Sequence, residues 1–153
     1  MRARTYAWLA IAGALIAGGV ALFRFELLSQ RPKIDPDNPA QVALGRRVYT
    51  DRCATCHGAN LEGQPNWMVR KLNGRLPAPP HDASGHTWHH PDQQLIVITK
   101  KGLSAIVPGY ESDMPAFEGV LTDEQIAAAL AFIESNWPSE IRARQHALTR
   151  ASS

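Results

Sequence analysis

Two stretches of the chain place apolar residues at helical spacing. The first begins at Asn38, which suits a helix N-cap and is followed by proline, and it runs to about residue 52. The second opens with a capping box formed by Thr122 and Gln125 and ends at Pro138. Its apolar face contains Ile126, Ala129, Leu130, Ile133 and Trp137. Both patterns predict amphipathic helices that pack against a core.

A third, shorter pattern covers residues 92–101 and ends at Gly102. It predicts a helix, although its run of β-branched residues would also suit a strand. Residues 73–91 and 103–120 are rich in proline, glycine and polar side chains, which indicates long loops. Loops of this length are uncommon unless they are functional or wrap around something.

The N-terminal region has a different composition. Residues 6–23 contain no charge over 18 positions, so a helix there would be about 27 Å long, close to the hydrocarbon thickness of a bilayer. Basic residues before it favour a cytoplasmic N-terminus and an exported remainder. The absence of a good small-residue cleavage site favours an uncleaved anchor over a cleaved signal peptide. The expected organisation is a membrane anchor (1–28), a linker (29–38), a helical domain (39–140) and a basic tail (141–153).

Charge is distributed unevenly along the chain. Residues 39–140 carry eight Lys or Arg against eleven Asp or Glu, a formal net charge of −3, whereas both ends of the chain are basic. The acidic domain gives no support to a nucleic-acid-binding function. The basic ends suit a position near a membrane surface.

The chemistry-bearing motif is C-x-x-C-H, formed by Cys53, Cys56 and His57. This spacing is the attachment signature of c-type haem. Two thiols on one helical turn can each add to a vinyl group of one porphyrin, and the adjacent imidazole can then bind the iron. These are the only two cysteines of the chain, so haem attachment would use both.

Three other interpretations of the motif remain open. A thioredoxin-like dithiol would need a βαβ context, which the predicted elements do not supply. A simple disulfide would suit an exported chain with two cysteines. Zinc could be held by both cysteines and two histidines from the set His81, His86, His89 and His90, although the gap back to Cys56 is longer than zinc fingers usually have.

Met114 is the candidate for the second axial ligand of a haem iron. It lies in a polar loop directly before Pro115, where a core methionine is unusual, and the other methionines are Met1 and Met68. Ligation by His57 and Met114 would give a higher potential than two histidines and would leave no open site at the iron. A loop histidine is the alternative ligand, which would give a lower-potential centre.

Two further residues are candidates for binding the haem propionates. Trp88 could donate its indole N–H, and Arg75 could form an ion pair. The surrounding histidines could also form a separate copper or zinc site, although a surface role is more common for such clusters.

Taken together, these residues resemble a class I c-type cytochrome. The resemblance covers about residues 39–137 and rests on Gly45 and Tyr49, the C-x-x-C-H motif, Met114-Pro115 and a final helix carrying Phe132. It implies an all-α fold of three to five helices around one covalent haem c, here preceded by a transmembrane helix. It also implies that the first and last helices cross, so that Gly45 and Tyr49 meet Leu130, Phe132 or Ile133.

The expected function is therefore transfer of single electrons between redox proteins, with no substrate chemistry. We expect the haem domain to face the periplasm from a bacterial inner membrane. The alternatives are a haem subunit or accessory protein of a membrane oxidase or dehydrogenase, and a metal-binding role for the histidine-rich loop.

Overall fold

The computed structural model of the chain describes residues 33–152 and, in isolation, Gly19. The predicted membrane anchor at residues 1–28 lies, apart from Gly19, outside the described residues. Within the described part, no helix is both long enough and apolar enough to cross a bilayer. The account that follows concerns the unit that begins at Lys33.

The described unit is built from helices and loops, and residues 33–152 contain no β-strand. Two single 3-10 turns, η1 (Thr87–His89) and η2 (Leu103–Ala105), interrupt the loops. The α-helices are α2 (Pro39–Arg52), α3 (Ala54–His57), α4 (Asp92–Lys101), α5 (Asp123–Ser135) and α6 (Ser139–Ala151). The all-helical expectation is therefore confirmed for this part of the chain.

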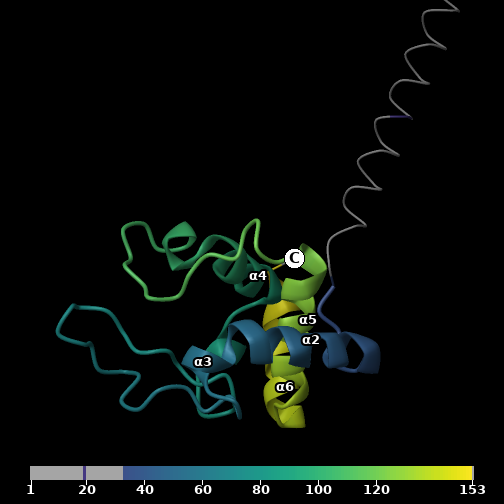
Figure 1. Cartoon of the computed structure of the whole chain (residues 1–153). Coiled ribbons are helices and arrows are strands. Elements are labelled where there is room, and N and C mark those ends of the chain that lie inside the picture. Colours follow the sequence, from purple (N-terminus) through teal and green to yellow (C-terminus); the bar gives the residue numbers. More distant parts are fainter. Residues whose placement is uncertain (1–18, 20–32, 153) are drawn as a thin grey trace, which may run out of the picture. The chain divides into compact units, whose positions relative to one another are not determined.

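Helices α2 and α5 cross at the centre of the unit (Figure 1). The Asn38 side chain caps α2 by accepting from two backbone N–H groups of its first turn. Gly45 lies at the crossing, and a Cβ added to it would overlap the backbone oxygen of Ala128. The rings of Tyr49 and Phe132 pack there with centroids 5.3 Å apart. The expected contact between the first helix and the C-terminal helical pattern is confirmed, and only glycine permits so close an approach.

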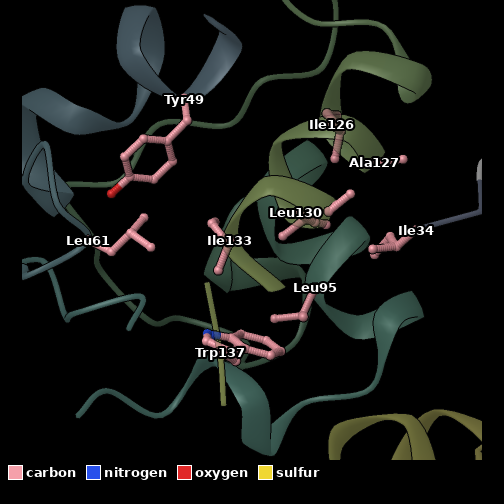
Figure 2. Packing of buried hydrophobic residues seen from close by; sticks show 10 residues of the cluster. Ile34, Tyr49, Leu61, Leu95, Ile126, Ala127, Leu130, Ile133 and Trp137 are labelled. Carbon is pink, nitrogen blue, oxygen red and sulfur yellow. The ribbon is translucent and has the colours of Figure 1, made fainter. Parts of the chain in front are cut away.

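Helix α5 forms the middle of the core. Its capping box is present as predicted, with Thr122 and Gln125 each accepting from the other's backbone N–H. The helix is buried on nearly all sides between Ile126 and Glu134, because small alanines let its neighbours approach closely. Figure 2 shows its side chains gathered with those of the other elements; the core cluster is Ile34, Tyr49, Leu61, Leu95, Ile126, Ala127, Leu130, Ala131, Ile133 and Trp137.

Residues 92–101 form helix α4, so the helical alternative for this stretch is the correct one. Leu95 is buried against the core, and Lys100 donates to Asp123 at the start of α5 at 2.6 Å. Gly102 ends the helix at a positive φ of 84°, which glycine adopts without strain.

The C-terminal segment, for which the sequence analysis predicted a basic tail and no helix, contains helix α6. The side-chain amide of Gln145, fully buried, donates to Asp92 Oδ1 at 2.6 Å, and the guanidinium of Arg144 lies 5.1 Å from the ring centroid of Trp88. Polar contacts and one partly buried Ile141 fix this helix, and most of its residues are polar or charged, so the segment has too few apolar residues to indicate a packed helix.

Candidate functional site

The C-x-x-C-H motif occupies the junction between two helices. Cys53 ends α2, and the next four residues form the single-turn helix α3, which ends at His57. Cys53 is half-buried, Cys56 is exposed, and both thiols are free. Burial is the main cause, and the nearby Cys56 a smaller one, that raises the pKa of Cys53 to about 11. This thiol is therefore protonated at neutral pH. A redox-active dithiol instead needs a lowered thiol pKa, so the thioredoxin-like interpretation gains no support.

The motif faces a cavity of about 570 Å³. This volume lies within the range of about 300–1,000 Å³ found for cofactor sites. Apolar side chains from α4, the loop after it and α5 line this cavity: Leu95, Ile98, Leu103, Phe117, Leu130 and Ile133. Both cysteines, His57 and Met114 also line this cavity. The donor set and the apolar walls fit a planar, largely apolar cofactor with an axially ligated metal.

His57 is held in one orientation. Its Nδ1 lies 2.9 Å from the carbonyl oxygen of Pro79. A carbonyl can only accept, so Nδ1 carries the proton and Nε2 keeps the lone pair that a metal requires. Burial lowers the pKa of His57 and so favours this neutral form. The hydrogen bond to Pro79 has a smaller effect in the opposite direction. The arrangement is that of a histidine ligand fixed by a backbone carbonyl.

Tyr49 fixes the turn that follows His57. Its hydroxyl lies 2.9 Å from the carbonyl oxygen of Gly58 and 3.3 Å from that of His57. Burial raises the pKa of Tyr49 far above its ordinary value, so the hydroxyl remains a donor. Tyr49 thus joins the helix crossing to the motif, which places the α3 turn relative to the core.

Met114 reaches the cavity from the loop between α4 and α5. Its backbone N–H donates to the hydroxyl of Ser112 at 3.0 Å, and its side chain is half-buried. Met68, by contrast, is 74% exposed. The structure therefore brings the predicted methionine to the same cavity as His57.

Arg75 does not line this cavity. Its guanidinium donates to Asp113 at 2.7 Å and lies 3.4 Å from Glu111, while Lys71 also donates to Asp113 at 3.1 Å. These ion pairs join the loop after the motif to the loop that carries Met114. The geometry supports a loop-joining role for Arg75 and gives no support to the predicted propionate contact.

Trp88 also lies away from the cavity. Its ring stacks on His89 with centroids 3.7 Å apart and packs against α6 beneath Arg144. Its indole N–H is buried without a hydrogen-bond partner among the described residues. Trp67, which the sequence analysis did not single out, lines the cavity instead and stacks on His86. No periodic signal distinguishes these two tryptophans, since both lie in irregular segments.

The loop histidines separate into two groups. His81, His86 and His90 line the cavity, whereas His89 stacks on Trp88. Across residues 33–152, no group of three or more His, Cys, Asp or Glu side chains is arranged to hold a metal ion. The zinc and copper interpretations therefore gain no support from the geometry. His81 stacks directly on His57, a contact that sequence analysis had no means to predict.

Comparisons with known proteins agree with this site. The family Cytochrome c matches residues 42–137, a range that ends just before α6. The chain is similar to cytochrome c-555 of Prosthecochloris aestuarii, with 33% identity over 102 residues, covering 60% of this chain and 84% of that protein. No solved structure shows a significant match. The chain therefore belongs to the cytochrome c family, and it is an electron carrier with covalently attached haem c.

Proposed function

We propose that the chain is a membrane-anchored monohaem cytochrome that passes single electrons on the periplasmic side of a bacterial inner membrane. The observation that carries this proposal is the convergence on one cavity. Cys53, Cys56 and His57 line it from one side, and Met114 reaches it from a loop 57 positions later in the chain. The single motif corresponds to a single haem.

Each of these residues has a defined role in the proposal. Cys53 and Cys56 bind the porphyrin covalently, so the cofactor cannot dissociate after export. His57 Nε2 and the Met114 sulfur would hold the haem iron. The bound haem would supply an iron that alternates between the ferric and ferrous states. With both ligands bound, the iron would have no open site for a substrate, and the chain would work as a carrier.

The redox part of the proposal is tested by a potentiometric titration of the full chain in mild detergent, with the haem absorption recorded at each potential. We expect one haem that titrates as a one-electron couple and is low-spin in both states. A high-spin ferric spectrum near neutral pH would mean that an axial position is open. That result would overturn the carrier function in favour of ligand binding.

The membrane part rests on the uncharged run at residues 6–23 and the basic residues before it. After alkaline carbonate washing of membranes, we expect the full chain to stay with the membrane. Protease added to spheroplasts should cut the haem domain. Release by the wash, or protection from the protease, would contradict the anchor or its orientation.

A fixed position in a membrane oxidase or dehydrogenase complex is the second candidate. It is favoured by exposed apolar side chains on the two loops beside the cavity, Met68, Val69 and Leu72 on one and Ile106 and Val107 on the other. Exposed apolar clusters of this kind mark interaction surfaces. A stoichiometric oxidoreductase that copurifies in mild detergent, and is lost when Met68, Val69 and Leu72 are changed to serine, would establish it. A solitary monomer would exclude it.

A further inference from the structure

His81 makes the closest ring contact to the proposed axial histidine. The ring centroids of His57 and His81 are 4.0 Å apart, with an angle of 22° between the planes. The Pro79 carbonyl holds the Nδ1 edge of the His57 ring, and His81 covers one of its faces. The His57 imidazole is thus restrained at one edge and on one face.

His81 is itself held from three directions. Its Nδ1 lies 2.8 Å from the hydroxyl oxygen of Thr87, its backbone N–H donates to Leu61 at 2.7 Å, and its carbonyl accepts from the Trp137 indole at 2.7 Å. Tyr49 approaches the ring edge-on at 6.2 Å between centroids. The two backbone bonds fix the position of the residue, and the bond to Thr87 fixes the rotation of its ring.

The support for His81 continues into α6. Thr87 begins η1 and is buried, and η1 is fastened to α6 through the contact of Trp88 with Arg144. Gln145 adds a 3.3 Å hydrogen bond to the carbonyl of His90. The histidine-rich loop therefore has a structural use, because it connects α6 to the ring that covers His57.

We propose that His81 is a positioning residue that fixes the plane of the His57 imidazole and keeps water from its covered face. The inference rests on the proposed ligation of the haem iron by His57. The plane of an axial imidazole determines its overlap with the metal d orbitals, and residues behind a ligand tune the metal through orientation and local polarity. Without the ring of His81, water would reach the ligand and stabilise the more highly charged ferric state.

The test compares three variants of the full chain by potentiometry and by electron paramagnetic resonance of the ferric state. His81→Ala should lower the reduction potential and shift or broaden the g values, because the His57 ring is then restrained only at its Nδ1 edge, by the Pro79 carbonyl. His81→Phe keeps a flat ring and should restore g values close to those of the wild type. Thr87→Val, which removes only the bond to Nδ1, should give a smaller change of the same kind and keeps the test valid if His81→Ala does not fold.

His146→Ala is the matched control, because His146 does not line the cavity and its Nε2 lies 3.5 Å from Glu134. It should leave both the potential and the g values unchanged. If His81→Ala, or Thr87→Val in its place, matches the wild type in both measurements, the inference is overturned while the carrier function stands. If His57 is not an axial ligand, the wild-type spectrum itself reveals this, so the two failures are distinguishable.

Discussion

The two sides of the cavity are built in different ways. On the His57 side, a helix junction, a backbone carbonyl and the Tyr49 hydroxyl hold the motif against the α2–α5 crossing. On the Met114 side, a loop is joined to its neighbour by ion pairs of Lys71 and Arg75 with Asp113, all partly exposed. Exposed ion pairs are worth about 0–1 kcal/mol each. The comparison teaches that core packing fixes the histidine side, whereas the methionine side depends on weak surface contacts.

The largest effect should follow from Gly45→Val, which damages the histidine side. A Cβ at this position would overlap the backbone oxygen of Ala128, and backbone atoms have little room to move. We expect a loss of about 3 kcal/mol or more in the free energy of unfolding, measured by denaturant titration. Ala43→Val on the exposed side of the same helix is the control and should cost about 0.5 kcal/mol. Equal costs for the two variants would contradict the close crossing.

The second effect is a pH dependence of α5, which packs against α2 on the histidine side. Burial is the main reason why the pKa of Glu134 is raised to about 8, and the negative charge of Asp92 adds to the effect. The positive charge of Arg142 acts in the opposite direction. His146 also faces this carboxylate at 3.5 Å. Because the folded pKa lies above the unfolded value, this group's stabilising effect is full below about pH 4.5 and is lost as the pH rises towards 8.

At pH 9, the free energy of unfolding of Glu134→Gln should therefore exceed that of the wild type by on the order of 3 kcal/mol. The free energy of unfolding of this variant should also depend less on pH. Denaturant titrations between pH 5 and about 9 measure this. A wild type that gains stability over that range would contradict the assignment. The absorption band due to Met114 ligation should not change with pH in the same way, since Glu134 lies in α5 and not in the loop that carries Met114.

Asp113→Asn breaks the methionine side more gently. It removes the negative charge that Lys71 and Arg75 share, and we expect only a small loss of global stability, because these groups are exposed to solvent. The spectral signature of methionine ligation should disappear at a lower temperature than in the wild type, well before global unfolding. High salt should likewise lower the temperature at which the wild type loses this spectral signature, because salt screens the ion pairs. Asp51→Asn, on the exposed side of α2, is the control; equal behaviour of the two variants would show that the ion pairs do not hold the loop.

The smallest effect is expected at the tip of the loop after the motif. Leu72 is fully exposed, so Leu72→Ser should change the free energy of unfolding by no more than about 0.5 kcal/mol. The absorption spectrum of the loaded protein should be unchanged. A large loss in either measurement would show that this loop contributes to the cavity more than its exposure indicates.

Sequence alone predicted the parts of the molecule that have local signals. The caps at Asn38 and Thr122, the helical spacing after them and the attachment motif each depend on a few neighbouring residues. Met114 was singled out because methionine is rare in this chain and this one lies in an unusual loop, and the structure places it at the cavity. Helix α6 was missed, since Gln145 is buried through polar bonds and not through an apolar stripe.

The roles of the aromatic and charged loop residues could not be predicted from neighbouring residues in the sequence. Trp67 and Trp88 both lie in irregular segments, and only the tertiary fold places one at the cavity and the other against α6. Arg75 finds its carboxylate partners about 36–38 positions away in the chain. His81 touches His57 because a proline-rich loop returns to the motif, and no pattern in the sequence encodes that return.

The central claim is that His57 and Met114 meet at one haem iron. The most direct test is the absorption spectrum of the oxidised full chain with haem attached, for the wild type, Met114→Ala and the control Met68→Ala. We predict a weak band at the red end of the visible spectrum, typical of ferric iron bound by a thioether, in the wild type and in Met68→Ala, and its loss in Met114→Ala. Absence of the band from the wild type, or its survival in Met114→Ala, would contradict the account.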